Sequence, residues 1–173
     1  MATLDKYEYK VRTDEMKQLI KEAKFAEAME IADSIDWRRV KNTKMLCVVS
    51  DIYKINHKFE ESKEILLLAY EKNQTSRLIV YSLCELCIKM DEVVEANEYL
   101  KEFIRLAPKD NGRYILRYKM LEAQDVSLEE RISVLEEYKK QVEEKNKELD
   151  AQFEIEKKLP PEPIVMPFEN LPD

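Results

Sequence analysis

The chain has 173 residues, of which 45% are hydrophobic and 38% are charged, and it contains a single glycine. This composition indicates one helix-rich domain and argues against a β-sandwich, which needs glycines in its turns. The formal charge of −7 disfavours nucleic acid as a partner, because phosphate contacts dominate that affinity.

The cysteine content and the first residues bear on the compartment. Three cysteines, an odd number, indicate free thiols in a reducing environment. The N-terminal stretch MATLDKYEYK holds no apolar segment of the kind found in signal peptides. No apolar run approaches the roughly 20 residues that span a bilayer. We therefore expect a cytoplasmic protein without a membrane span in this chain.

The sequence repeats itself with a period of about 34 residues, a length typical of helical-pair repeats. The period appears in four sets of positions: Met16, Ser50 and Cys84; Leu19, Tyr53 and Cys87; Phe25, Phe59 and Val93; and Ala28, Ser62 and Ala96. Such a repeat predicts a solenoid, in which each helical pair buries its apolar face against its neighbours.

Three helical pairs follow the period closely. We expect the first from about Tyr7 to Asp36, the second over 42–74 and the third over 77–108. Within each pair, apolar residues recur every three or four positions, as in an amphipathic helix. The link over 21–24 is short, so the first two helices are expected to be antiparallel. Pro108 closes the third pair, because proline cannot continue a helix.

The fourth pair departs from this regularity. Its second helix is predicted to slip by one residue, which places Leu128, Ile132 and Leu135 on its apolar face. Ser127 and Glu130 form a capping box that fixes the start of this helix. We expect the helix to run to about residue 157.

The C-terminal part has a different character. Residues 142–158 are predicted to be a charged helical extension, with apolar residues too irregularly spaced to predict a coiled coil. Residues 159–173 hold five of the six prolines and are expected to be an extended tail. This tail either docks into a groove, in the same chain or a second copy, or serves as a linker.

The packing positions resemble the tetratricopeptide repeat (TPR) family. The second pair matches that pattern at Leu46, Ser50, Tyr53, Phe59, Ser62, Leu66 and Ala69. The stretches IDWRRVKNTKML and DIYKI also resemble bacterial TPR proteins of unassigned function. The family's turn glycine is replaced by Ala23, His57 and Asp91. The resemblance implies an all-α, right-handed solenoid over residues 7–141, with repeats at about 9–42, 43–76, 77–110 and 111–141.

The resemblance also implies a concave face lined by the first helix of each pair. On that face we expect a partner-binding surface of mixed charge around a partly apolar middle, as in a peptide groove. Its predicted residues are Lys17, Lys44, Asp51, Lys54, Tyr81, Glu85, Lys89, Ile115 and Lys119. Thr13 and Leu116 map to the same face. TPR modules that clamp chaperone tails need Lys, Asn and Arg at positions that here are Thr13, Lys17, Val48, Leu78 and Ser82, and none matches.

No catalytic, cofactor-binding or metal-binding residues are predicted. Cys84 and Cys87 form a C-x-x-C pair, but they occupy packing positions of the repeat, so we expect core packing and not redox or zinc chemistry. His57 is expected in a polar turn. Trp37 is expected to seal the joint between the first two repeats, with an exposed anchor for a partner as the alternative.

These observations predict a non-enzymatic scaffold that binds a protein or an extended peptide on its concave face. The alternative is a self-associating structural protein that uses the C-terminal helix and tail. The two differ in whether the chain alone forms oligomers.

Overall fold

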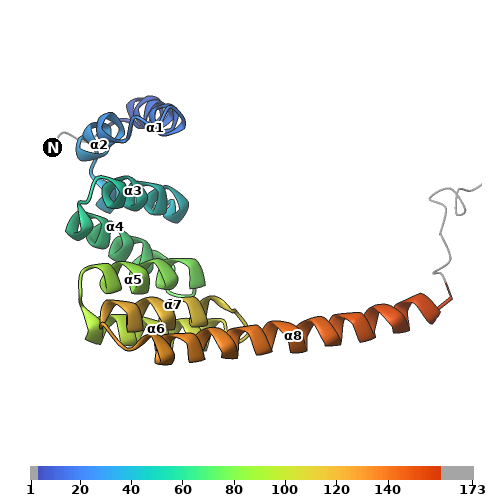
Figure 1. Ribbon diagram of the computed structural model, residues 1–173. Coiled ribbons are helices and arrows are strands. Elements are labelled where there is room, and N and C mark those ends of the chain that lie inside the picture. Colours follow the sequence, from blue (N-terminus) through green and yellow to red (C-terminus); the bar gives the residue numbers. More distant parts are fainter. Residues whose placement is uncertain (1–3, 161–173) are drawn as a thin grey trace, which may run out of the picture.

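The computed structural model describes residues 4–160, which form a stack of helical pairs without any strand in that range. The helices are α1 (Lys6–Lys21), α2 (Phe25–Asp33), α3 (Thr43–Ile55), α4 (Phe59–Lys72), α5 (Arg77–Lys89), α6 (Val93–Leu106), α7 (Gly112–Ala123) and α8 (Leu128–Lys158), with a 3₁₀ turn, η1 (Trp37–Arg39), between the first two pairs. Figure 1 shows the pairs stacked along one axis, and α8 running out beyond them. The expected all-α solenoid is confirmed.

The first helix of a pair begins at a side-chain cap in three of the four repeats. Asp5, Asn42 and Ser76 accept hydrogen bonds from backbone N–H groups of the first turns of α1, α3 and α5. These bonds satisfy donors that have no partner within the helix. The capping residue Ser127 also accepts from the Glu130 N–H at 3.5 Å, which confirms the predicted start of α8.

The turn within each pair repeats one backbone geometry. Ala23, His57, Asp91 and Asp125 have φ angles of 58°, 60°, 59° and 54°. Each is followed by a residue whose N–H bonds to a carbonyl five positions earlier, as in the bond from Lys58 to Tyr53 at 2.8 Å. This pattern ends helices at a left-handed residue, a conformation that favours glycine. The positions identified as glycine replacements are therefore left-handed without being glycine.

The core follows the repeat period. Ala28, Ser62 and Ala96 are completely buried. The facing positions Met16, Ser50 and Cys84 are buried as well. Small residues recur at Ala28, Ser62 and Ala96 because paired helices cross closely at these points, and a larger side chain would force the helices apart.

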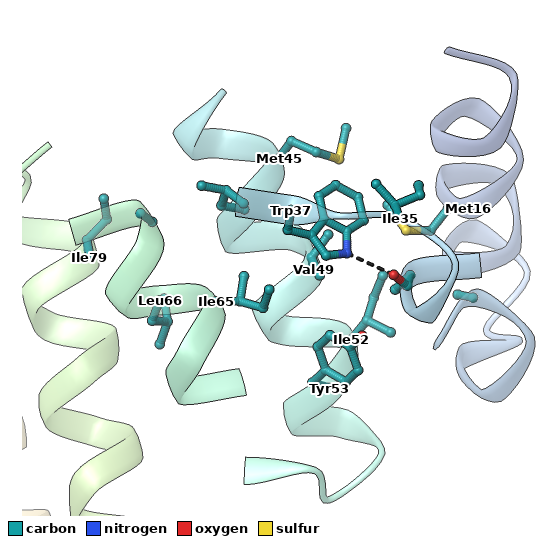
Figure 2. Close-up of a cluster of buried hydrophobic side chains, with 14 of the residues drawn as sticks. Met16, Ile35, Trp37, Met45, Val49, Ile52, Tyr53, Ile65, Leu66 and Ile79 are labelled. Atoms are coloured by element: carbon teal, nitrogen blue, oxygen red, sulfur yellow. Dashed lines mark hydrogen bonds between the residues drawn. The ribbon is translucent and has the colours of Figure 1, made fainter. Parts of the chain in front are cut away.

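Trp37 closes the joint between the first two pairs. Its ring is 4% exposed, and its indole N–H donates to the Ala32 carbonyl at 2.8 Å (Figure 2). Around it gather Ile35, Met45 and Val49. The expectation that Trp37 seals this joint is confirmed, and the alternative of an exposed anchor is wrong.

The predicted slip in α8 is wrong. Val134, one repeat period after Leu100, is the buried residue of this helix at 3% exposure, so α8 packs at the unshifted position of Leu100 and not through the predicted face. Leu128, Ile132 and Leu135 are exposed. Polar and aromatic residues border Val134 on the buried side of α8. This side is therefore not the most apolar side of the helix, and the sequence pattern did not indicate it.

The end of the chain adds two facts. Helix α8 ends at Lys158, close to the predicted residue 157. The predicted proline-rich tail lies outside the described residues from 161 onward. Among the helices between residues 4 and 160, none has an apolar stretch long enough to cross a bilayer.

Candidate functional site

Three first helices carry one row of alternating charges. Lys54 near the end of α3, Glu85 on α5 and Lys119 on α7 lie side by side. The Lys54 ammonium is 3.6 Å from Oε1 of Glu85, and the Lys119 ammonium donates to its Oε2. We call these three residues the charged row. It joins three repeats, and all three members belong to the predicted partner surface.

Glu85 is the centre of the row. Its side chain is only 18% exposed. Burial alone would raise the pKa of Glu85, but the hydrogen bond from Lys119, together with the charges of Lys119, Lys54 and Lys89, holds it below its ordinary value. The same contact raises the pKa of Lys119 despite its burial. Glu85 is therefore a fixed anion that holds two lysines in place.

Tyr81 lies one turn before Glu85 on α5 and has a packed ring. Its ring meets the edge of Phe103 with centroids 5.6 Å apart. A Cβ on Gly112 would come within 3.2 Å of the Tyr81 ring and 3.1 Å of Phe103. The only glycine of the chain thus stands where α7 starts against these rings, and any side chain there would push Tyr81.

The remaining predicted residues are spread over the same helices. Asp51 pairs with Lys54 at 3.5 Å and so adjoins the charged row. The positive charge of Lys89 helps to lower the pKa of Glu85. Ile115 is 41% exposed on α7. Lys17 and Lys44 are exposed on α1 and α3, and no described contact joins either of them to the row.

Two residues mapped to this face are in fact buried. Thr13 is 4% exposed, and its hydroxyl donates to the carbonyls of its own helix, at 2.9 Å to Tyr9. Leu116 is completely buried in the core formed with Val80 and Cys84. Neither can contact a partner. Both errors arise from carrying a helix register over to the outermost repeats, where the neighbours differ.

The C-x-x-C pair packs in the core, as expected. Cys84 and Cys87 are completely buried, and burial raises the pKa of each thiol to about 12. Cys87 lies near Glu92 and Glu95, with the ligand atoms of all three within 4.8 Å of one another. The ammonium of Lys63 binds Glu92 and lies 3.9 Å from Glu95. A cation is thus already present, and the thiol is held protonated, so this cluster is suited to an ion pair and not to a metal.

A hollow at the N-terminal end was not indicated by any sequence pattern. It has a volume of about 450 Å³ where the start of α1 meets the joint after α2. Its lining includes three cations, two carboxylates and a tyrosine: Leu4, Asp5, Lys6, Tyr9, Ile35, Asp36, Arg39, Val40, Lys41 and Asn42.

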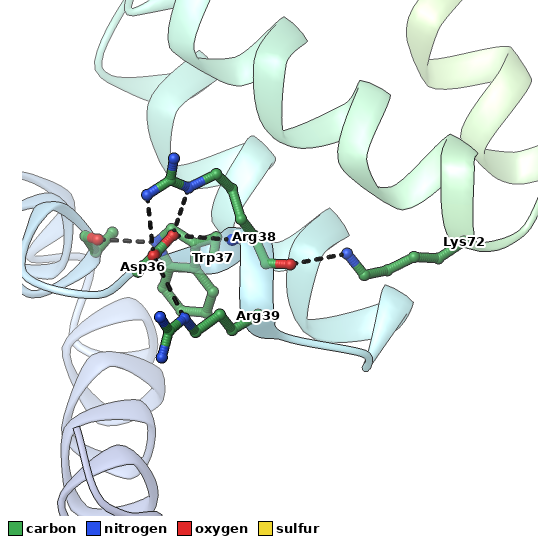
Figure 3. Close-up of polar contacts among 6 residues, drawn as sticks. Asp36, Trp37, Arg38, Arg39 and Lys72 are labelled. Atoms are coloured by element: carbon green, nitrogen blue, oxygen red, sulfur yellow. Dashed lines mark hydrogen bonds and ion pairs between the residues drawn. The ribbon is translucent and has the colours of Figure 1, made fainter. Parts of the chain in front are cut away.

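Both carboxylates of this hollow have partners. The Asp36 carboxylate accepts two hydrogen bonds from the Arg38 guanidinium, at 2.9 and 3.0 Å (Figure 3). Asp5 accepts from the Glu8 N–H. The Lys72 ammonium donates to the Arg38 carbonyl at 3.3 Å and ties the joint to α4. The lining of the hollow thus combines apolar side chains with three cations and two partnered carboxylates, which suits a side chain with an apolar body and an anionic end. The residues that line the hollow come from the start and the end of the first repeat, so no short sequence motif indicates it.

Comparison with known proteins establishes the fold. No protein-family model matches the chain, and no curated protein sequence is similar to it. A solved structure described as MamA protein superposes with a TM-score of 0.61 at 16% identity, covering 76% of this chain and 72% of that chain. A MamA RS-1 double mutant gives a TM-score of 0.62 at 14% identity, with 81% and 77% covered. MamA is a TPR-like helical-repeat protein, and likeness at this identity concerns the fold alone.

Proposed function

We propose that this chain is a non-enzymatic scaffold that binds an acidic protein segment or extended peptide across α3, α5 and α7. The observation that carries the proposal is the charged row of Lys54, Glu85 and Lys119, which spans three repeats. In this view residues 7–141 form the binding domain, and residues 142–158 form a separate extension.

The charge of this surface supports an acidic partner. The predicted residues on α3, α5 and α7 include four lysines and two carboxylates, although the whole chain has a formal charge of −7. A positive surface on a negative protein steers an acidic segment to one face and repels it from the others. The orientation of the partner is thereby restricted before contact.

The arrangement of the surface also supports binding. Glu85 already holds Lys54 and Lys119 in position, so a partner loses little side-chain entropy in ordering them. Exposed apolar residues flank the row, with Leu78 72% exposed on α5 and Ile115 on α7. An extended peptide could place an apolar side chain on these residues and a carboxylate on the lysines.

Selection from a displayed peptide library tests the proposal. Wild-type protein is expected to enrich peptides with clustered Asp and Glu. Selected peptides are then titrated against a Lys54→Glu/Lys119→Glu variant, for which we expect affinity to fall at least tenfold. The matched control is Lys101→Glu, which reverses an exposed lysine on the second-helix face. If the site is as proposed, Lys101→Glu should bind the selected peptides as tightly as wild type does.

Two outcomes would contradict the proposal. If enriched peptides are not acidic, the charge argument is wrong. If acidic peptides bind the double variant and the control equally well, the site lies elsewhere, and the N-terminal hollow is then examined with Lys6→Glu/Lys41→Glu. Circular dichroism on each variant separates lost binding from lost folding.

A further inference from the structure

The exposed side of α8 carries an apolar stripe that no other part of residues 4–160 covers. Leu128, Ile132 and Leu135 are 58%, 43% and 43% exposed, and Leu149 and Phe153 are 53% and 63% exposed. The side of α8 that packs on α7 is a different one. There Val134 is buried, and in the same contact Tyr138 stacks on Tyr114 at 5.7 Å.

These apolar residues stand at positions that face solvent in the other repeats. Ile132 lies one repeat period after Glu98 and two periods after Glu64, and both glutamates are exposed. Leu135 lies one period after the exposed Lys101. At the position of Ile132 both earlier repeats place a glutamate, whereas the positions of Leu128 and Leu135 are apolar in one earlier repeat each, at the exposed Val94 and the half-buried Leu67. The stripe therefore does not serve the packing of the solenoid.

The stripe has the period of a heptad repeat once the exposed face is followed along the whole helix. One series is Leu128, Leu135, the half-buried Val142 and Leu149, and a second, displaced by one helical turn, is Ile132, Lys139, Asn146 and Phe153. These are the d and a positions of a heptad. We call the two series together the seam. Within residues 142–158 alone the apolar residues are irregularly spaced. The heptad positions of the seam become clear only when residues 128–153 are taken together.

The part of α8 beyond the body needs a partner to explain it. Every residue from 143 to 158 is exposed, and at 1.5 Å per residue this arm is roughly 24 Å long. Most helical stability in proteins comes from tertiary packing, and within residues 4–160 this arm has none. Figure 1 shows the arm extending away from all other helices.

We propose that two copies of this chain associate through the seam of α8 in a parallel, two-stranded coiled coil. The first heptad of the seam favours this assembly, because leucine at d, as at Leu128 and Leu135, with a β-branched residue at a, as at Ile132, favours two strands. Asn146 is at an a position, where a single polar residue fixes register by pairing with its equivalent, at a cost in stability. Lys139 adds a further cost, and its long side chain can reach solvent.

The flanking charges select the parallel orientation. In a parallel pair, residues at g positions meet the e positions of the following heptad in the second chain. Lys145 then meets Asp150 of the partner subunit. In an antiparallel pair the e positions would face one another, and Glu129, Glu136, Glu143 and Asp150 occupy four of them. Like charges in contact oppose that arrangement.

Sedimentation equilibrium of the full chain tests the association, which is independent of the proposed peptide site. Wild type is expected at twice the chain mass of 20.6 kDa. Leu149→Asp/Phe153→Asp is expected at the mass of one chain. The matched control is Ile155→Asp, since Ile155 is equally apolar and 62% exposed but lies off the seam; it should remain a dimer. All three residues lie on the arm, outside the core, so circular dichroism should show an intact body.

Several results would overturn the proposal. The wild type could be monomeric at every concentration, or the seam variant could stay dimeric. Alternatively, Ile155→Asp could dissociate the dimer as completely as the seam variant does. Orientation is tested by oxidising Leu149→Cys, which should give a linked dimer on a non-reducing gel, because equivalent d positions meet in a parallel pair but lie far apart near the end of an antiparallel seam. The control Glu144→Cys faces solvent and should stay unlinked. Failure of Leu149→Cys to link would contradict the parallel register.

Discussion

The hydroxyl oxygens of Ser50 and Ser62 lie 2.8 Å apart where α3 crosses α4, and both side chains are buried. One repeat later the same crossing is made by a different pair, in which the Cys84 thiol donates to the Ala96 carbonyl at 3.3 Å. The same packing site of the repeat is thus filled by two serines in one pair and by a cysteine and an alanine in the next. Each pair fits as a unit, because the larger sulfur faces a methyl group and the smaller oxygen faces a hydroxyl.

This relationship predicts that the third repeat's pair can be transplanted into the second. Ser50→Cys alone should lower the free energy of unfolding by about 1–3 kcal/mol, because sulfur crowds the Ser62 hydroxyl. Ser62→Ala alone should cost about 1 kcal/mol through its lost hydrogen bond to the Ser50 carbonyl. The double variant should cost clearly less than the sum. Urea denaturation measures all three, and strict additivity would show that the pairs are not units.

The left-handed turns predict a stabilising substitution. Ala23 has a φ of 58°, a conformation that costs a residue with a Cβ about 1–2 kcal/mol. Glycine avoids this cost and gives back about 0.5–1 kcal/mol in unfolded-state entropy. Ala23→Gly should therefore raise the free energy of unfolding by about 0.5–1 kcal/mol.

Ala26→Gly, at an exposed position in the first turn of α2, is the matched control for Ala23→Gly. It should lower the free energy of unfolding by about 0.5 kcal/mol, since glycine is less favourable than alanine in a helix and the cost is smaller in the first turn than in the interior. Thermal melting of the two variants checks the sign of each change. Equal destabilisation by both would mean that the turn does not hold its left-handed geometry in solution.

The buried thiols predict an order of reactivity. Burial raises the pKa of Cys84 and of Cys87 to about 12, so almost no thiolate is present at mildly alkaline pH. Cys47 is half-buried, and its pKa is raised mainly by burial as well. Iodoacetamide should modify Cys47 first and the other two only after unfolding. Peptide mass spectrometry reads the order, with protein in urea as the control in which all three react.

The core positions could be predicted from the sequence because the repeat period reproduces one environment. Ala28, Ser62 and Ala96 meet equivalent neighbours in successive pairs, so a rule that fits one fits the others. The same register put Glu85 and Lys119, one period apart, on a single face. The structure places these two residues in contact.

The register of α8 could not be predicted in this way. The apolar-face rule assumes that the most apolar side of a helix is the buried one, and in α8 the larger apolar stripe is exposed. Val134 alone marks the packed side, between Arg131 and Tyr138. The N-terminal hollow was missed for another reason: it forms where the start of α1 meets the end of the first repeat, and a repeat pattern does not describe chain ends.

The charged row predicts a pH-dependent stability that can be assigned to one residue. Lys119, Lys54 and Lys89 hold the pKa of Glu85 below its ordinary value of 4.5 in the folded protein. A lowered folded pKa contributes stability that is fully present above the ordinary value and is lost as pH falls through the folded value. At neutral pH, Glu85→Gln should therefore lower the free energy of unfolding by about 1 kcal/mol, because the row is partly solvated.

The difference between wild type and Glu85→Gln should shrink as pH falls below 4.5, since wild-type Glu85 then becomes neutral too. Urea denaturation of both proteins at a series of acidic pH values gives this difference directly, and effects of the other carboxylates cancel. Glu98→Gln, at an exposed position on α6, should match wild type throughout. A difference for Glu85→Gln that does not change with pH would mean that Glu85 is not held as an anion by its lysines, and the preorganisation argument for the binding surface would fail with it.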